Sequence, residues 1–273
     1  MDMMHIYPNS HLEAADPRKV MVISSQAKSK EFQRWWTNYV EPNRSEYTVY
    51  LDPPVFEGDD YDVNEYLAVA RDLHPEYMTV PDARFNAELT TFLFKRWSAQ
   101  CSHIARKGVL AVAQGKTPEQ WIQCAKWLVG TQVPMLLAVV EETDMWVDTK
   151  MLGRLEWLTY MKHEAPELFG VKLHLFGLSE AATELWFIRM TYRNWVVSCD
   201  TGKGVVWTAA DRSLPEVPIP TLVPPYPGRK ALATDFFSLP LPRDAAYAEL
   251  LKYNLSVLNA WAAGNWIQGG YSV

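Results

Sequence analysis

The sequence has few cysteines and no long apolar segment. Its three cysteines, among 273 residues, are widely spaced and form no Cys-x-x-Cys pair, which argues against a disulfide framework and a cysteine-based zinc site. The first ten residues lack a basic segment followed by an apolar run, so we expect no signal peptide. No stretch reaches the roughly 20 apolar residues that cross a bilayer. We therefore expect a cytoplasmic protein without a membrane partner.

Repeats, low-complexity tracts and a basic excess are also lacking. The formal charge of −6 is the opposite of the basic surplus that phosphate binding usually produces. Basic residues do cluster locally, and we expect most of these clusters to be solvated helix faces. The clusters are Arg18 with Lys19, Lys28 with Lys30 and Arg34, Lys95 with Arg96, Arg106 with Lys107, and Arg229 with Lys230.

Apolar residues are arranged as short runs that alternate with longer helical patterns. They make up 48% of the chain, which is enough to bury a large core. The runs are continuous rather than alternating, as in parallel strands that are covered on both faces. The predicted strands are Val20–Ser24, Thr48–Leu51, Tyr77–Val80, Val109–Ala113, Pro134–Val140, Val171–Phe176, Trp195–Cys199 and Val205–Thr208.

Helix signals fill the intervals between these runs. Asp62 is a plausible N-cap for a helix that ends near Leu73. Thr117, followed by Pro118, begins another helix, and Gly130 ends it. An irregular, proline-rich stretch follows over residues 211–242, and an apolar-periodic helix over 243–265 closes the chain. The other predicted helical segments are Phe85–Lys107, Asp148–Glu164 and Ser179–Arg193.

This alternation predicts the α/β class. Eight strand candidates with helical crossovers, in a chain of 273 residues, favour a single (β/α)8 barrel domain that spans residues 1–273. A doubly wound sheet is the alternative.

Polar residues follow several of the predicted strands. The carboxylates of Asp52, Asp82, Glu141 and Asp200 each follow one strand, and Gln114 with Gly115 follows another. In a barrel these positions face the active site. A single aspartate is often a turn or capping residue, but carboxylates that converge repel each other, which is costly without a chemical purpose. Paired carboxylates of this kind serve glycosyl chemistry.

Metal binding by the same residues is the weaker interpretation. His174 lies in the middle of a predicted strand, where we expect it to be a core residue rather than a ligand. We therefore expect no metal.

The order of these segments resembles the tRNA-guanine transglycosylase superfamily, in particular its short phage-type members that insert 7-deazaguanines into DNA. The similarity runs collinearly from about Thr48 to Thr208. Its segments are LDPPVFEGD, TVPDARFNAELTTFLFKRW, GVLAVAQGKTPEQW, VPMLLAVVEE, VKLHLFGLSEAATELW and VVSCDTGKGVVWTA.

The chain departs from the family pattern at three places. It lacks the Cys-x-Cys-x-x-Cys…His zinc site of the tRNA enzymes, and with it the subdomain that this metal holds. Ala138, Val139 and Val140 replace a glycine-rich base pocket, and two prolines follow Asp52 where the family has glycine.

The resemblance implies a base exchange through a covalent intermediate. Asp200 matches the nucleophile that attacks C1′ of a guanosine nucleotide, and Asp52 matches the carboxylate that carries the proton. Asp82 and Gln114 match residues that hydrogen-bond the purine edge. The other implied substrate-binding positions are Gly115, Glu141 and Gly177.

The implied partners are DNA and a 7-deazaguanine base such as preQ0 or a derivative, and no cofactor is implied. A target in duplex DNA has to leave the base stack, at a cost of a few kcal/mol. Three other functions stay open: the same exchange on tRNA, a retaining glycoside hydrolase that uses Asp52 or Glu141 with Asp200, and a non-catalytic barrel that binds nucleic acid.

Overall fold

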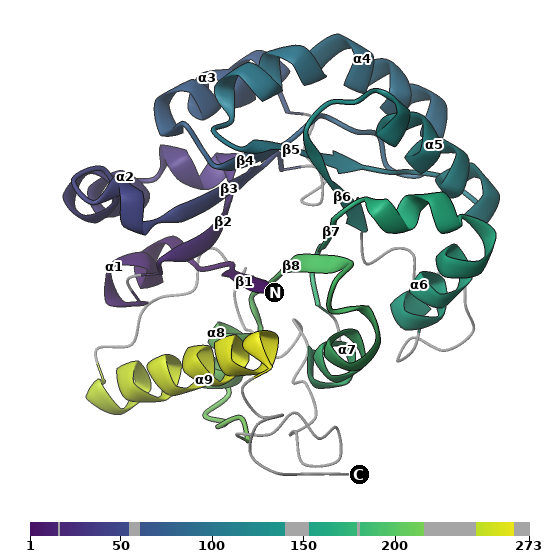
Figure 1. Cartoon of the computed structure of the whole chain (residues 1–273). Helices are drawn as coiled ribbons and strands as arrows, with labels where there is room; N and C mark the ends of the chain where they lie inside the picture. The colour runs from purple at the N-terminus through teal and green to yellow at the C-terminus, as the bar shows by residue number, and fades with distance from the viewer. Residues whose placement is uncertain (16, 55–60, 140–152, 179–180, 216–243, 265–273) are drawn as a thin grey trace.

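The computed structural model describes residues 1–15, 17–54, 61–139, 153–178, 181–215 and 244–264. Within these ranges eight parallel strands close into a barrel in the order β1 to β8, and β8 pairs with β1. Helices surround the barrel (Figure 1). The strands are β1 (Asp2–His5), β2 (Lys19–Ile23), β3 (Thr48–Asp52), β4 (Tyr77–Thr79), β5 (Gly108–Val112), β6 (Met135–Val139), β7 (Leu173–Leu175) and β8 (Val196–Thr201). The closed barrel confirms the predicted fold and excludes the doubly wound sheet.

The helices begin at the capping residues that the sequence indicates. The Asp62 side chain accepts a hydrogen bond from the backbone N–H of Asn64, and Thr117 caps α5 in the same way. These bonds satisfy N–H groups that have no partner inside a helix. The helices are α1 (Leu12–Ala15), α2 (Lys30–Trp35), α3 (Val63–Leu73), α4 (Ala87–Ile104), α5 (Pro118–Gly130), α6 (Gly153–Glu164), α7 (Ala181–Phe187), α8 (Lys203–Ala209) and α9 (Ala245–Ala263).

Helix α9 confirms the predicted closing helix, and Asp244 caps its first turn. Of the predicted irregular stretch, residues 211–215 are described and contain no helix or strand. The rest of that stretch lies outside the described residues, so the single-domain organisation over 1–273 stays a prediction.

One predicted strand is wrong, because residues Val205–Thr208 belong to α8. This helix is buried on all sides, so it has no polar stripe to reveal a helical period. Gly204 lets α9 approach closely, since a Cβ atom there would lie 2.8 Å from Leu255 Cδ2. A short, β-branched apolar run therefore looks like a buried strand, although it is a helix beneath α9.

The eighth strand is β1 at the N-terminus, which the sequence analysis missed. Its residues, Asp-Met-Met-His, carry no β-branched side chain and give no local strand signal. Its extended form comes from pairing with β8, where Asp2 lies opposite Ser198 and His5 lies opposite Thr201. The strand is thus determined by barrel closure between residues nearly 200 positions apart.

Alternate residues of each strand face the barrel interior or the surrounding helices, as the pleat requires. In β3, Val49 and Leu51 pack in the layer between strands and helices, whereas Tyr50 packs inside the barrel. The buried apolar residues of the interior are Met4, Met21, Tyr50, Leu110, Val112, Leu136, Ala138 and Phe176. They fill the barrel with side chains, so polar groups at its C-terminal end rest on a packed floor.

A buried carboxylate ties the N-terminal face of the barrel together. Glu76, which is 4% exposed, accepts a hydrogen bond from the backbone N–H of Val49 at 2.7 Å. Its two oxygens also pair with Arg44 and Arg106, each at 3.1 Å. Because this face lies opposite the catalytic end of such barrels, the cluster is a stability element.

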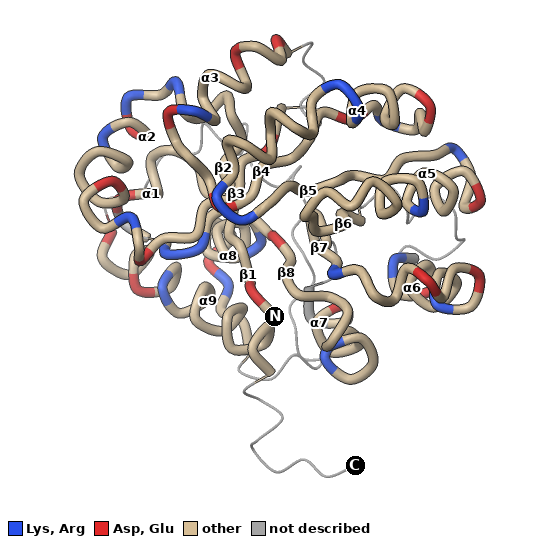
Figure 2. Tube along the Cα trace, turned by 45° about the horizontal axis from the view of Figure 1, so that its top comes forward, with Lys and Arg blue, Asp and Glu red and all other residues tan. Residues whose placement is uncertain are grey.

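Charged residues of both signs are interleaved on the outer helices (Figure 2). Several members of the basic clusters pair with carboxylates: Arg18 with Glu46, Lys28 with Glu65, and Arg34 with Glu13. These pairs fit the interpretation of solvated surface residues. None of the helices in the described ranges is long and apolar enough to cross a membrane.

Two buried histidines lie where α9 packs on the first strand and the segment after it. His5 Nε2 lies 3.1 Å from Asn259 Oδ1, and His11 Nε2 lies 2.8 Å from the Tyr247 hydroxyl. Burial lowers the pKa of each imidazole to about 4. Both side chains are therefore neutral in the folded protein at neutral pH.

We expect the protein to lose stability as the pH falls from 6.5 to 4, because the unfolded chain then binds protons that the folded chain excludes. No stability is lost above pH 6.5, whereas at pH 4 each histidine lowers the free energy of unfolding by up to about 3 kcal/mol. Urea unfolding at pH 7 and pH 5 measures the effect. A double His5→Gln, His11→Gln variant should show a smaller loss over this interval, and an equal loss in both proteins would contradict the assignment.

Candidate active site

The polar residues predicted at the strand ends do gather at the C-terminal end of the barrel. Asp52 is the last residue of β3, and Gln114 lies two residues after β5. Asp82 follows β4 in the loop before α4, and Gly177 follows β7. Asp200 lies inside β8, one residue before its end, rather than after the strand. Glu141 lies outside the described residues.

Asp200 is a buried carboxylate that is anchored through one oxygen. It is 1% exposed, and its Oδ1 atom accepts a hydrogen bond from the Gly177 backbone N–H at 3.1 Å. His174 Nε2 lies 3.2 Å from the same oxygen. Both contacts end on Oδ1, and no hydrogen bond from the described residues is seen at Oδ2. These two contacts fix one of the two carboxylate oxygens.

His174 connects Asp200 to a polar group deeper in the barrel. Its Nδ1 atom lies 2.9 Å from the Ser198 hydroxyl, and Ser198 is in turn hydrogen-bonded to Tyr50. Burial raises the pKa of Tyr50, and the bond to Ser198 lowers it in part. His174 is a fully buried interior residue as expected, but it contacts the predicted nucleophile, which the sequence analysis did not foresee.

Gly177 holds its position by conformation and by contacts on both sides of its backbone. Its φ of 55° lies in the left-handed region that favours glycine. While its N–H donates to Asp200, its carbonyl accepts from Arg154 Nη2 at 3.0 Å. Arg154 also forms a buried ion pair with Glu184 at 3.4 Å. This pair supports the backbone that anchors Asp200.

Asp52 lies on β3, which is separated by β1 and β2 from the strand that carries Asp200. It is 7% exposed, and its Oδ1 atom accepts a hydrogen bond from the Thr79 hydroxyl at 2.5 Å. Tyr61 lies near enough that Asp82 and Asp52 both raise its pKa, after burial, which is the largest cause. Asp52, Asp82 and Tyr61 therefore form one electrostatic group above β3 and β4.

The pleat places Asp52 and Asp200 on the same side of their strands as the barrel interior. Tyr50 and Ser198 are hydrogen-bonded to each other inside the barrel. Asp52 and Asp200 lie two residues further along β3 and β8 respectively. Since side chains alternate along a strand, both carboxylates point inward, one pleat nearer the C-terminal end.

Gln114 shapes the loop that carries Asp82. Its Nε2 atom donates to Asp82 Oδ2 at 2.8 Å, and its Oε1 atom accepts from the Phe85 backbone N–H at 3.0 Å. Phe85 has a φ of 58°, which is uncommon for a residue with a side chain. The amide of Gln114 has a second N–H hydrogen, which can reach a ligand while the bond to Asp82 persists.

Close packing explains why residue 115 is a glycine. A Cβ atom at this position would lie 2.5 Å from the Trp121 backbone nitrogen. The glycine therefore lets the first turn of α5 pack against the end of β5. Its predicted role in substrate binding is not tested by this contact.

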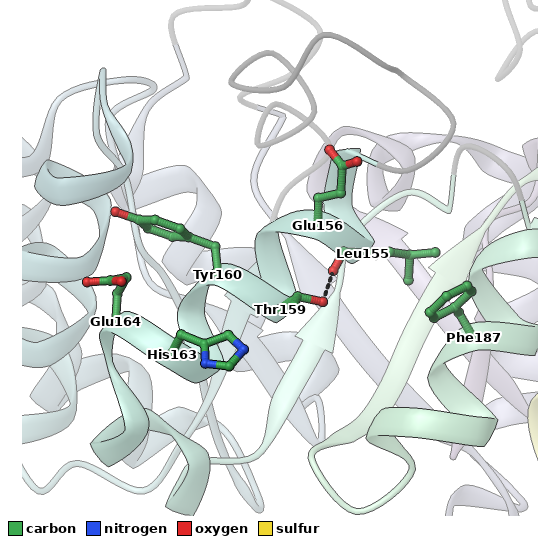
Figure 3. Close-up of a pocket in the computed structure, with 7 residues that line it drawn as sticks. All are labelled: Leu155, Glu156, Thr159, Tyr160, His163, Glu164 and Phe187. Carbon is green, nitrogen blue, oxygen red and sulfur yellow. Dashed lines mark hydrogen bonds between the residues drawn. The ribbon is translucent and has the colours of Figure 1, made fainter.

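An open groove of about 540 Å³ lies on the outer surface between α6 and α7. Its lining comes from one face of α6 and from Phe187 of α7 (Figure 3). The lining residues are Leu155, Glu156, Thr159, Tyr160, His163, Glu164 and Phe187. The barrel wall separates this groove from the inward-facing carboxylates, so we place the candidate active site at the strand ends and not in the groove.

The contact between His174 and Asp200 was not predicted from the sequence, and neither were the roles of Ser198, Thr79 and Arg154. A signal for Ser198 was present, because Ser198 and Asp200 are polar residues at alternate positions of one apolar strand. Among the described residues, no group of three or more His, Cys, Asp or Glu side chains is arranged to hold a metal ion.

No protein-family model matches the chain, and no curated protein matches it either.

Proposed function

We propose that this protein exchanges guanine in DNA for a 7-deazaguanine base, through a covalent intermediate on Asp200. The observation that carries the proposal is the geometry of Asp200: a buried carboxylate at the C-terminal end of the barrel, whose hydrogen bonds to the described residues all end on Oδ1. The collinear resemblance to the transglycosylase superfamily gives the substrate class. A fixed carboxylate with one available oxygen is what a glycosyl-transfer nucleophile requires.

In the first half-reaction Asp200 Oδ2 attacks C1′ of the target nucleotide. The bond from C1′ to N9 breaks, and guanine leaves with the bonding electrons and takes up a proton. In the second half-reaction the incoming base loses its N9 proton and attacks C1′, which returns an electron pair to the Asp200 carboxylate. The sugar is inverted twice, so its configuration is retained.

Asp52 is the proton carrier in this proposal. It lies in the inward-facing layer with Asp200, on a different strand, and the Thr79 hydroxyl holds one of its oxygens at 2.5 Å. The phenol of Tyr61 stays neutral beside it, because burial and the two nearby aspartates raise the Tyr61 pKa. A carboxylate near a neutral phenol can take the proton of the incoming base.

Asp82 and Gln114 read the purine edge. Asp82 is only partly buried, so it is accessible to a ligand, and Gln114 fixes its orientation through Oδ2. Guanine and 7-deazaguanines present the same N–H donors along their pyrimidine edge. A carboxylate can accept hydrogen bonds from these groups. A base that leaves these groups unpaired loses about 1–3 kcal/mol of binding free energy.

Base exchange with labelled substrate tests the proposal. Purified protein is incubated with a labelled 7-deazaguanine and, in parallel, with guanine-containing duplex DNA or tRNA. We expect label in DNA, none in DNA with Asp200→Ala, and normal incorporation with the control Asp2→Ala at the N-terminal end of β1. Label in tRNA alone would show that the proposed chemistry is right but that the polymer substrate is tRNA and not DNA.

If wild-type protein labels neither polymer, the transglycosylase function is wrong. Release of reducing sugar from a panel of saccharides would then indicate the retaining glycoside hydrolase. Nucleic-acid binding that Asp200→Asn leaves intact, without turnover, would indicate the non-catalytic barrel.

A further inference from the structure

A continuous chain of polar side chains crosses the apolar interior of the barrel. It runs from Tyr50 on β3 to Ser198 on β8, then to His174 on β7, and ends at Asp200 on β8. All four residues are buried, and none is more than 3% exposed. Polar groups in such a place are costly unless each is hydrogen-bonded. This chain satisfies them in series, and it ends on the oxygen of Asp200 that Gly177 also holds.

The acceptor at the end of the chain sets the direction of the two bonds that His174 makes. An ionised carboxylate only accepts, so the contact at 3.2 Å needs a proton on His174 Nε2. The other nitrogen of a neutral imidazole is then an acceptor, and it takes the Ser198 hydroxyl hydrogen at 2.9 Å. For a neutral imidazole, the chain thus selects the Nε2–H tautomer of His174.

Aromatic rings hold the imidazole in place from two sides. The ring of Tyr50 stacks on it with centroids 5.5 Å apart and an interplanar angle of 27°. The ring of Phe176 meets it edge-on at 4.9 Å and 77°. A ring fixed in this way can turn very little, so the position of its Nε2 atom relative to Asp200 is fixed as well.

We propose that His174 is the positioning residue of the nucleophile: its neutral Nε2–H group holds Asp200 Oδ1 and so aims Oδ2 at the sugar. This inference rests on the proposed function. In the second half-reaction, the bond from C1′ to Asp200 breaks and its electron pair returns to the carboxylate. The N–H groups of His174 and Gly177 stabilise that returning charge, as the donors of an oxyanion hole do.

A neutral donor suits a nucleophile better than a cation. A charged imidazolium beside Asp200 would stabilise the free carboxylate strongly and make it a weaker nucleophile. Ser198 and Tyr50 act through His174, because the Ser198 hydroxyl occupies Nδ1 and keeps the proton on Nε2. The polar chain therefore fixes the tautomer of His174, which packing alone would not do.

Two substitutions of His174 separate positioning from folding. The amide nitrogen of His174→Gln reaches the place of Nε2 and can still donate to Asp200, whereas that of His174→Asn reaches only the place of Nδ1. We expect His174→Asn to lower kcat for base exchange by about 10²–10³-fold, with KM for DNA changed less than about threefold. His174→Gln should recover most of that loss, and Ser198→Ala should cost less than about tenfold.

Thermal unfolding of each variant measures folding, and a second readout is independent of activity. In protein labelled with ¹⁵N-histidine, the His174 signal, assigned by its loss in His174→Gln, should show a protonated Nε2 and an unprotonated Nδ1. Asp200→Asn should shift this signal and leave those of the other histidines unchanged. An Nδ1–H tautomer would overturn the inference.

The activity results separate the two proposals. A folded His174→Asn variant that exchanges bases at the wild-type rate would overturn the role of His174 and leave the proposed function intact. Equal losses in His174→Asn and His174→Gln, with lowered unfolding temperatures in both, would show a structural residue and overturn the role as well. Absence of exchange in the wild-type protein would overturn the proposed function, and the role of His174 with it.

Discussion

Replacing Asp200 by asparagine is expected to lower base exchange by at least about 10⁴-fold, because the substitution removes the nucleophile and little else. The asparagine carbonyl oxygen can still accept from the Gly177 N–H and from His174 Nε2, which hold Oδ1 at 3.1 and 3.2 Å in the wild-type protein. The side chain is buried, and its volume does not change. Folding should therefore be preserved while the covalent step is lost.

Denaturing gel electrophoresis of protein mixed with labelled DNA measures the covalent step directly. Wild-type protein should carry label that resists denaturation, and Asp200→Asn should carry none. Asp52→Asn is the matched comparison, because it removes the charge of the other inward-facing carboxylate. It should still form the adduct but exchange bases slowly. Adduct formation by Asp200→Asn would assign the nucleophile to another residue.

The largest effect on stability is expected for Glu76→Ala. Glu76 is the buried acceptor for the Val49 backbone N–H and the common partner of Arg44 and Arg106. Its removal leaves the buried Val49 N–H without its acceptor and the largely buried Arg44 without its counter-charge, although Arg44 keeps its bonds to two backbone carbonyl groups. Breaking a buried charged network in this way costs about 3–5 kcal/mol of unfolding free energy. Urea unfolding monitored by tryptophan fluorescence measures it.

Glu46→Ala is the control for this prediction. Glu46 also pairs with an arginine, Arg18, but both side chains are about half exposed, so we expect a change below about 1 kcal/mol. Glu76→Gln should be intermediate, because it keeps an acceptor for Val49 and loses the charge. A loss for Glu76→Ala no larger than that for Glu46→Ala would mean that the network at the N-terminal face contributes little.

Local signals in the sequence determined most of the secondary structure. The continuous apolar runs of β2 to β8 and the caps at Asp62 and Thr117 require only neighbouring residues for their effect, so the pattern alone predicts them. The same holds for α9 with its N-cap at Asp244. The number and spacing of the apolar runs predicted the barrel and the end at which the carboxylates lie, although the count of eight included Val205–Thr208, which is helical, and lacked β1.

The tertiary structure decided the elements whose state depends on distant partners. The four-residue strand β1 exists because β8 pairs with it, and Val205–Thr208 is helical because α9 covers it. Neither fact has a local signal: a short strand without β-branched residues and a helix without a polar face both lack the periodicity that a sequence pattern shows.

The candidate site divides in the same way. The positions of Asp52, Gln114 and Asp200 at strand ends could be predicted from the sequence, because they depend only on where each run stops. The bond between His174 and Asp200 could not be predicted, because it joins residues of two strands whose register contains a bulge beside His174. Which polar groups meet inside a barrel depends on strand register and shear, and these are set only when the whole sheet closes.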